Sequence, residues 1–316
     1  MQFRTKIPIK KEIQAIDYNS NVVLFGSCFS ENISKKLAYY KFAEFTNPLG
    51  ILFHPKAIEK LILKAVQREQ FTEEAVFFHN ERWHCFDAHS SLSAISKEEL
   101  LQGLNTAIDS TNQQINKASH IIITLGTAWV YRLLETDSLV ANCHKIPQQK
   151  FSKVLLSVDE IVRSLTAIIS SIKMINSKAQ IVFTLSPVRH NKDGFVENAQ
   201  SKAHLLAAIH TVVKKGNISY FPAYEILMDE LRDYRFYAED MLHPNQIAID
   251  YIWEQFCETW LEDTTLQTMK GIDAIQKGLA HKPFHPNSEQ HQDFIKHIYK
   301  QIDVLQGKFP RMFFEK

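Results

Sequence analysis

Two side chains that can act as nucleophiles stand directly after a short apolar run near the N-terminus. Residues 22–25, Val-Val-Leu-Phe, predict a buried strand. Gly26 then permits a sharp turn, Ser27 and Cys28 follow it, and a helix is expected to begin near Ser30, a suitable N-cap residue. The first amides of such a helix can hold an oxyanion, and they favour the thiolate of a nearby cysteine. The alternative is an ordinary strand-to-helix turn with a buried cysteine.

A candidate general base lies far along the chain, in the run Asp240-Met241-Leu242-His243-Pro244. Pro244 suits the first position of a following helix, which leaves His243 at its N-cap boundary. Asp240 stands three residues before the histidine, so its carboxylate can reach the imidazole and fix the tautomer. A nucleophile, a base and an acid that orients the base form the general arrangement for covalent catalysis.

The elements that must position these residues alternate along the chain. Strands are predicted at residues 22–25, 121–125, 180–185 and 218–221, with weaker signals at 41–45, within 71–93 and at 129–134. Helices are predicted at residues 31–39, 55–67, 100–115, 158–175, 197–214, 224–231 and 244–266. This alternation indicates an α/β fold with a parallel sheet, and right-handed crossovers make it a doubly wound three-layer sandwich.

The loops after the first three strong strands emerge at the same edge of that sheet, which therefore gathers the nucleophile turn and its neighbours. The backbone amides of Gly50, Gly126 and Thr127 join those of the turn as candidate donors to an oxyanion. Losing one such donor typically costs about 2.7–4 kcal/mol of transition-state stabilisation.

Composition and charge limit the classes of function. The 316 residues are 45% hydrophobic and 22% charged, which is typical of a globular protein with a large core. The formal net charge of +1 argues against a nucleic-acid-binding surface or a polybasic membrane patch. No apolar run is long enough to span a membrane, and residues 1–11 lack the apolar centre of a signal peptide. We therefore expect a cytoplasmic protein with reduced cysteines and no nucleic-acid or membrane partner.

The chain is expected to divide into two parts. Residues 1–266 contain all the strand signals and form the α/β domain. Residues 267–316 carry no strand signal, and the spacing of Phe294, Ile295, Ile298 predicts an amphipathic helix. We expect this segment to be a helical C-terminal extension packed on the first domain.

Seven short blocks of the sequence resemble one known family. They are Gly26-Ser27-Cys28-Phe29-Ser30, Asn47-Pro48-Leu49-Gly50-Ile51, Leu125-Gly126-Thr127-Ala128-Trp129-Val130-Tyr131, Asn142-Cys143-His144-Lys145, Ser186-Pro187-Val188-Arg189-His190, residues 198–202 and residues 240–244. The resemblance is to the GSCFA family of the SGNH (GDSL-like) hydrolase superfamily, and it extends over residues 20–256. It implies a flavodoxin-like three-layer fold and a site of the esterase or acyltransferase type.

The first block departs from the superfamily pattern at its functional position. The superfamily reads Gly-Asp-Ser there, with the serine as nucleophile, and the resemblance places that serine on Cys28 and the aspartate on Ser27. We therefore expect Cys28 to be the nucleophile, with Ser27 as the alternative. The superfamily also has an asparagine that donates to the oxyanion, and this asparagine is missing from the corresponding block here. Thr127, Asn142 or Asn47 would take its place.

Other polar residues are expected beside the site. Arg189 and His190 follow the third strong strand, and Arg189 can either bind a carboxylate or phosphate of a substrate or form a structural salt bridge. Lys202 falls on the next helix, where a solvated helix face is the favoured interpretation.

Two pairs of adjacent residues, His84-Cys85 and Cys143-His144, raise the question of a zinc site. Adjacent residues chelate a tetrahedral ion poorly, and neither pair has the usual spacing of about two to four residues between ligands. We therefore expect no metal and no cofactor.

The leading hypothesis is a hydrolase or acyltransferase that acts on esters of a small molecule or a carbohydrate. Cys28 attacks the acyl carbonyl, and His243, oriented by Asp240, takes the thiol proton. The alternative from another class is a non-catalytic module that binds a glycan or a protein through the aromatic residues 71–86. A metal hydrolase would require the two His–Cys pairs to converge. Hydrogen-bond reach between Cys28 and His243 discriminates the first two hypotheses.

Overall fold

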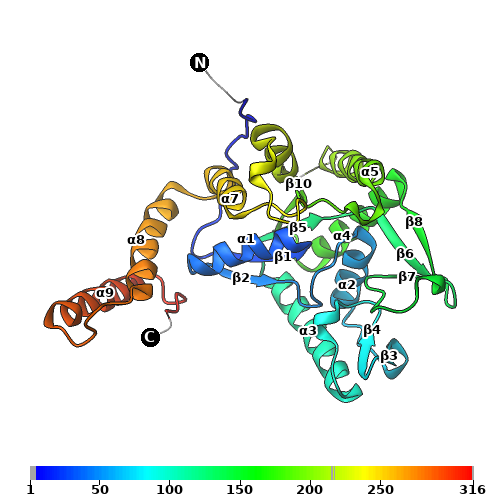
Figure 1. Cartoon of the computed structure of the whole chain (residues 1–316), viewed down its shortest axis with the longest axis horizontal. Coiled ribbons are helices and arrows are strands. Elements are labelled where there is room, and N and C mark those ends of the chain that lie inside the picture. Colours follow the sequence, from blue (N-terminus) through cyan, green and yellow to red (C-terminus); the bar gives the residue numbers. More distant parts are fainter. Residues whose placement is uncertain (1–4, 215, 217, 315–316) are drawn as a thin grey trace.

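The computed structural model describes residues 5–214, 216 and 218–314 and is organised around a five-stranded sheet (Figure 1). The strand order is β2-β1-β5-β9-β10, and every neighbouring pair runs parallel. The strands are β1 (Asn21–Gly26), β2 (Ala43–Thr46), β5 (His120–Leu125), β9 (Gln180–Leu185) and β10 (Ile218–Phe221). The chain steps outward from β1 to β2 and then returns past β1 to β5. The carboxyl ends of β1 and β5 therefore meet where open α/β sheets bind ligands.

Helices cover both faces of the sheet, because alternate strand residues point to opposite sides. In β1, Val23 and Phe25 belong to the core cluster under α2, α3, α4 and α5, whereas Val22 and Leu24 belong to the cluster under α1 and α7. These helices are α1 (Cys28–Tyr39), α2 (Pro55–Gln67), α3 (Lys97–Lys117), α4 (Val158–Ile175), α5 (Phe195–Val213) and α7 (Gln246–Trp260). The α/β class, with a central parallel sheet flanked by helices, is confirmed. A short α6 (Ala223–Glu225) and a π-helical turn (Ile226–Leu231) follow β10.

The first helix begins earlier than the sequence indicates. Ser27 rather than Ser30 is the N-cap of α1, because its backbone is extended (φ −74°, ψ 176°) and its hydroxyl accepts the Phe29 amide at 3.3 Å. The Ser30 hydroxyl instead points back to the sheet and donates to the Phe25 carbonyl at 3.1 Å. Cys28 is therefore the first residue of the helix.

The prediction of one long helix over residues 244–266 is wrong. The structure has α7 (Gln246–Trp260) followed by α8 (Asp263–Ala280). Between them, Leu261 leaves the helical conformation (φ −103°, ψ 147°) and forms a parallel bridge with Ile16. A contact with the N-terminal segment thus interrupts the helix, and the boundary expected after residue 266 falls inside α8.

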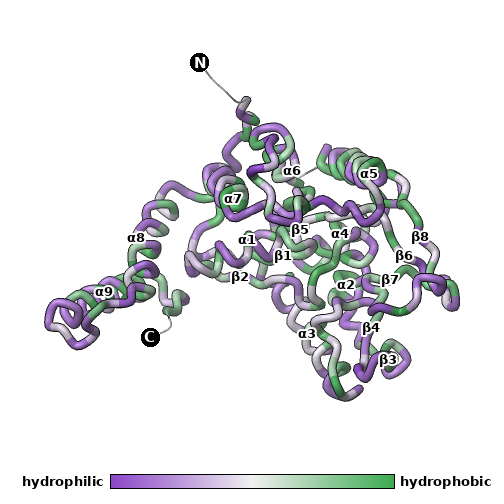
Figure 2. The backbone as a smooth tube through the Cα atoms, in the orientation of Figure 1, coloured by the Kyte–Doolittle hydropathy of each residue, from purple (hydrophilic) through white to green (hydrophobic). Residues whose placement is uncertain are grey.

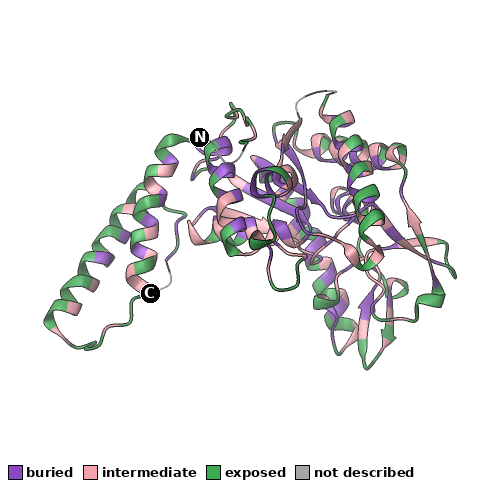
Figure 3. Ribbon diagram, turned by 45° about the horizontal axis from the view of Figure 1, so that its top comes forward, coloured by how far each residue is buried: buried purple, intermediate pink, exposed green. Residues whose placement is uncertain are grey.

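The C-terminal residues form a helical hairpin that projects from the body of the molecule (Figures 1 and 3). α9 (Glu289–Lys308) packs against α8 through Ile298 and Ile302, and hydrophobic and hydrophilic residues alternate along both helices (Figure 2). The chain then returns to the main body, where the Phe309 ring lies 4.9 Å from the Tyr18 ring. The tail therefore ties the hairpin to the α/β domain.

Two smaller antiparallel sheets flank the central one. Their strands are β3 (Val76–His79) and β4 (Arg82–Cys85) in one sheet, and β6 (Trp129–Leu133), β7 (Ser138–Val140) and β8 (Phe151–Leu155) in the other. The hairpin of β3 and β4 confirms the weaker strand signal within residues 71–93. The sequence predicts only β6 of the second sheet. Among the described helices, none is both long enough and apolar enough to cross a bilayer.

Candidate active site at the carboxyl edge of the sheet

The nucleophile turn is held tightly against the neighbouring strand. Gly26 adopts φ +129°, and a Cβ atom at this position would stand 2.0 Å from the Thr124 carbonyl oxygen, so only glycine fits. The Ser27 amide donates to the same oxygen at 3.2 Å, and the Ser27 side chain is buried. Cys28, by contrast, is partly exposed. Of the two candidate nucleophiles, Cys28 is therefore the accessible one.

The thiol of Cys28 is the favoured form, despite its place at a helix N-terminus. Burial raises the pKa of this thiol above its ordinary value, and the carboxylate of Glu31 in the same turn raises it further. The amide of Cys28 and the charge of Lys35 act in the opposite direction and are outweighed. The expected stabilisation of the thiolate is thus overcome by burial, and attack by Cys28 requires a base.

A base of the required kind is present and oriented. His243 Nδ1 lies 2.6 Å from Asp240 Oδ2, and Asp240 Oδ1 accepts the amides of Leu242 and His243, each at 2.9 Å. These hydrogen bonds, the backbone ones most strongly, lower the pKa of Asp240 to about 2. The carboxylate is therefore ionised and accepts the Nδ1 proton, which leaves Nε2 free to accept another. Asn245, not His243, is the N-cap of α7, so the histidine lies just outside the helix.

The helices that carry the two groups lie side by side and run parallel. Lys36 Nζ of α1 pairs with Asp250 Oδ1 of α7 at 2.5 Å, and one turn further the Tyr40 and Trp253 rings stack at 6.0 Å. Cys28 and His243 stand at the N-terminal ends of this helix pair, eight residues before Lys36 and seven before Asp250. Both ends lie over the carboxyl edge of the sheet. Among the hydrogen bonds of the described residues, none joins the Cys28 sulfur to the His243 ring, so the contact that was to discriminate an enzyme from a binding module is not formed in this structure.

The predicted oxyanion donors are occupied by the protein itself. The amides of Gly126 and Thr127 both donate to the Phe53 carbonyl, at 2.7 and 3.1 Å, and the Gly50 amide donates to the Asn47 carbonyl at 2.7 Å. The prediction that these three amides are available is therefore wrong in this arrangement. The reason is the loop after β2, which crosses the carboxyl ends of β1 and β5 and supplies the carbonyls.

The two asparagines considered as donors lie in different places. Asn142 is engaged within the protein: its Nδ2 donates to Ser90 Oγ at 3.1 Å, and its Oδ1 accepts the His144 amide. Asn47 lies at the turn, where its Oδ1 accepts the Gly26 amide at 2.8 Å. The Nδ2 atom of Asn47 is buried and has no partner among the described residues. Asn47 is therefore the asparagine that fits a donor role.

Arg189 contacts the turn that holds the base, and His190 lies beside Gly126. The Arg189 amide donates to the Leu242 carbonyl at 3.1 Å, so the loop after β9 and the His243 turn are joined directly. A Cβ atom on Gly126 would lie 3.0 Å from His190 Nε2, a buried nitrogen with no partner in the described chain. Burial lowers the pKa of His190 to about 3, and the nearby ammonium groups of Lys202 and Lys192 act in the same direction. His190 is therefore a neutral imidazole.

Lys202 is not on a solvated helix face, so that interpretation is wrong. The side chain is 2% exposed, and its Nζ donates to the Gly126 carbonyl at 2.8 Å and to the Ser186 carbonyl at 2.7 Å. It thereby ties the end of β5 to the end of β9, directly under the site. Burial lowers the pKa of Lys202 to about 7. The sequence signal that could have indicated this role is the position of Lys202 in residues 198–202, one of the blocks that resemble the family.

The His–Cys pairs converge in part, beside the β3–β4 hairpin. The rings of His84 and His144 lie 4.7 Å apart, and His144 Nε2 donates to the Cys85 carbonyl at 2.7 Å. The two nitrogens of His84 bond to Ser93 Oγ and the His79 carbonyl. The described residues contain no group of three or more His, Cys, Asp or Glu side chains placed to hold a metal.

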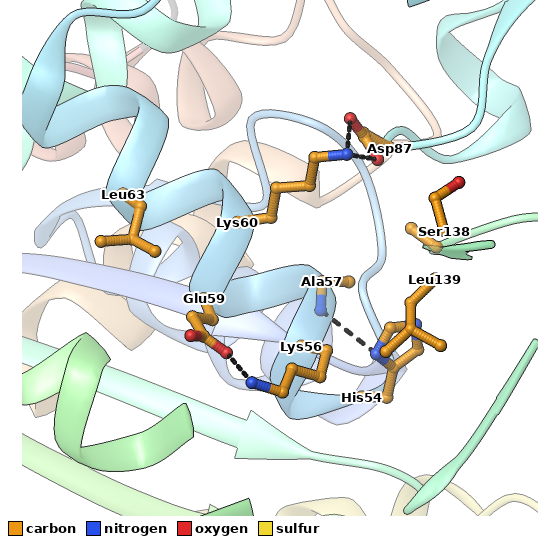
Figure 4. A pocket seen from close by; sticks show the side chains of 10 residues that line it. His54, Lys56, Ala57, Glu59, Lys60, Leu63, Asp87, Ser138 and Leu139 are labelled. Atoms are coloured by element: carbon orange, nitrogen blue, oxygen red, sulfur yellow. Dashed lines mark hydrogen bonds and ion pairs between the residues drawn. The ribbon is translucent and has the colours of Figure 1, made fainter. Parts of the chain in front are cut away.

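A separate groove lies between α2 and β7, away from Cys28 and His243 (Figure 4). It has a volume of about 280 Å³, and its charged side chains pair with one another. Lys56 bonds to Glu59 and Lys60 to Asp87, each at 2.7 Å. Buried His54 caps α2 by accepting the Ala57 amide. The groove is therefore lined by no cysteine, and its charged side chains are paired.

Comparison with known proteins places the chain in a family. No curated protein matches it. A solved structure described as "a putative platelet activating factor from Streptococcus pneumonia" is 11% identical, covering 78% of this chain and 86% of that chain, with a TM-score of 0.41. The model of the GSCFA domain protein, C-terminal domain, matches residues 272–316. The model of the GSCFA family matches residues 21–256, which include Cys28, Asp240 and His243, and the chain therefore belongs to the GSCFA family.

Proposed function

We propose that this chain is a hydrolase or acyltransferase of ester bonds, of the SGNH type with its flavodoxin-like sandwich. The observation that carries the proposal is the 2.6 Å contact between His243 Nδ1 and Asp240 Oδ2. It belongs to a turn beside the helix end that bears the accessible Cys28. A thiol, an imidazole with a free Nε2 and an ionised orienting carboxylate are the three groups that covalent acyl transfer needs.

The reaction follows from these groups. His243 Nε2 takes the thiol proton as Cys28 Sγ attacks the acyl carbon, and Asp240 stabilises the imidazolium. The tetrahedral intermediate expels the alcohol, which receives the proton from His243, and an acyl thioester remains on Cys28. Water or an acceptor alcohol then attacks this thioester with His243 as base, and the thiol is regenerated. The Cys28 amide and Asn47 Nδ2 are the proposed donors to the oxyanion.

We propose substrates that are esters of small molecules or carbohydrates, and a cytoplasmic location. All four cysteines, Cys28, Cys85, Cys143 and Cys257, are free, and free thiols are usual in a reducing compartment.

A binding module is the second candidate, and one observation favours it. Phe78 on the β3–β4 hairpin is 59% exposed, and its ring lies 5.5 Å from that of Trp83. Exposed aromatic side chains of this kind suit contacts with a sugar ring or a protein surface.

Hydrolysis of p-nitrophenyl acetate tests the enzymatic proposal. Wild type should release nitrophenolate and carry an acetyl group on Cys28, detected by peptide mass spectrometry, whereas Cys28→Ala and His243→Ala should lose turnover. Cys143→Ala is the matched control, because Cys143 is also a partly exposed thiol but lies elsewhere. Equal background rates in all four proteins, with no adduct, would contradict the proposal and favour the binding module.

A further inference from the structure

Arg189 is a positive charge beside the base turn with no acidic partner. Among the described residues, no carboxylate forms an ion pair with its guanidinium. The nearest loop acids are engaged elsewhere: Asp233 pairs with Arg235 at 3.0 Å and Asp240 with His243. The structural salt bridge that was one of the two interpretations of Arg189 from the sequence is therefore not formed among the described residues.

The guanidinium is held in place by aromatic rings instead. Its central carbon lies 4.1 Å from the centre of the Tyr237 ring and 5.2 Å from that of the Tyr234 ring. Tyr237 and Pro244 form an antiparallel bridge, so one support of the arginine lies on the same small hairpin as His243. The guanidinium also donates a hydrogen bond to the Tyr237 hydroxyl. Stacking of this kind fixes the plane of a guanidinium and leaves its remaining N–H groups available to a planar anion.

A small cavity adjoins the stacked guanidinium, and two arginines and one aspartate lie in its lining. Its volume is about 90 Å³, and Arg232 and Asp233 line it together with Arg189 and the two tyrosines, with the Asp233 carboxylate already paired with Arg235. Arg232 has only a loose contact with Asp229, at 3.8 Å. A carboxylate is small enough to approach such a cavity, and two guanidinium groups near it favour negative charge.

We propose that Arg189 is the recognition residue for an anionic group of the substrate, and that the substrate class is esters that carry a carboxylate. This inference deepens the proposed function and rests on it, because the bound anion is a substrate only if the chain is an enzyme. Recognition of the anion itself depends only on the guanidinium and its two aromatic supports, so it can be measured without catalysis.

Binding of glutarate is the direct test. The Cys28→Ala variant, which cannot turn over an ester, should bind glutarate in a calorimetric titration, and glutaramide, the uncharged analogue, should bind at least about tenfold more weakly. Adding Arg189→Gln should weaken glutarate binding by about tenfold or more. Arg235→Gln is the control, since Arg235 lies between the two supporting tyrosines in the segment before α7 and is already paired with Asp233. Any residue but proline preserves the backbone bond to Leu242, so Arg189→Gln should fold.

The outcomes separate the two proposals. Hydrolysis of mono-p-nitrophenyl glutarate against p-nitrophenyl hexanoate by wild type, corrected for spontaneous hydrolysis, reports on the enzyme. Arg189→Gln should lower kcat/KM for the glutarate ester about tenfold more than for the hexanoate ester. Glutarate binding that is absent, matched by glutaramide or unchanged by Arg189→Gln would overturn the anion site, even if both esters are hydrolysed. Arginine-dependent binding without any hydrolysis would retain the anion site and overturn the enzyme.

Discussion

His243 Nδ1 lies 2.6 Å from Asp240 Oδ2, and the same carboxylate accepts two amides of its own turn. The carboxylate is thus fixed by the backbone before it orients the imidazole. Because these bonds lower the pKa of Asp240 to about 2, the carboxylate retains its negative charge at neutral pH. The turn is a preorganised base, built within four consecutive residues.

Replacing Asp240 by Asn should therefore disable the base without disturbing the fold. An amide can accept from backbone N–H groups as the carboxylate does, but it cannot stabilise an imidazolium. We expect kcat for ester hydrolysis to fall by roughly 10²–10⁴-fold, with a much smaller change in KM. Asp233→Asn, on the same loop but paired with Arg235, is the matched control. An Asp240→Asn enzyme as fast as wild type would remove Asp240 from the mechanism.

Ser27→Ala should weaken the fold and spare the chemistry. The Ser27 hydroxyl caps α1 by accepting the Phe29 amide, and loss of such a cap costs about 0.5–2 kcal/mol in the free energy of unfolding. Urea titrations should show this loss. After treatment with p-nitrophenyl acetate, the Ser27→Ala protein should still carry the acetyl group on Cys28. A fully stable Ser27→Ala protein that fails to form an acyl-enzyme would instead identify Ser27 as the nucleophile.

Alkylation of Cys28 should depend on pH in a characteristic way. Its pKa is raised, so the rate of reaction with iodoacetamide should keep rising with pH beyond about 9, measured in a Cys143→Ala background. Glu31→Gln removes a neighbouring negative charge and should shift this rise to lower pH. Glu98→Gln, which changes an acid in the first turn of α3, should not. A rate that is already maximal at pH 7 would show that Cys28 is a thiolate at rest.

Local patterns predicted the parts of this site that are local. The apolar run before Gly26 gave a parallel strand with the nucleophile turn at its carboxyl end, and the three-residue spacing of Asp240 and His243 gave a hydrogen-bonded pair. Both depend on contacts between residues that are close in sequence. The alternation of strands and helices likewise carried the α/β class, because it reflects which faces each element must bury.

Most of the incorrect predictions concern contacts between distant segments. The Gly126 amide is occupied because Phe53 crosses the sheet edge, and the last long helix is broken because Leu261 pairs with Ile16. Lys202 is buried because two strand ends place carbonyls around it. No spacing within a helix or strand encodes such partners, so they emerge only when the chain is folded.

Two glycines should respond in opposite directions to alanine. At Gly26 the new Cβ would meet the Thr124 backbone oxygen at 2.0 Å, with φ at +129°, so Gly26→Ala should lose more than about 3 kcal/mol of unfolding free energy or fail to fold. At Gly103, inside α3, nothing lies within 4 Å, and Gly103→Ala should gain about 0.5–1 kcal/mol. Urea unfolding of both variants checks this. Comparable stability for the two variants would show that the turn at Gly26 is not constrained as described.

The lowered pKa of Lys202 should make the stability of the protein depend on pH. Burial lowers this pKa from 10.5 to about 7 on folding, so between these pH values the unfolded chain binds a proton that the folded chain has released. The contribution of Lys202 to the free energy of unfolding should therefore rise with pH between pH 7 and about 10.5, by at most about 1.4 kcal/mol per pH unit. Below pH 7 both states are protonated, and the cost of burying the charge is fully present.

Lys202→Met removes this titration together with two hydrogen bonds to carbonyls. The loss of these hydrogen bonds changes the free energy of unfolding of the variant by an amount that does not depend on pH, because backbone carbonyls do not titrate. The slope of the stability difference between wild type and variant against pH is therefore the diagnostic quantity. Urea unfolding at pH 7, 8, 9 and 10 should show wild type gaining on Lys202→Met at each step. A difference that stays constant over this range would mean that Lys202 remains charged in the folded protein, held by the carbonyls of Gly126 and Ser186 despite its burial.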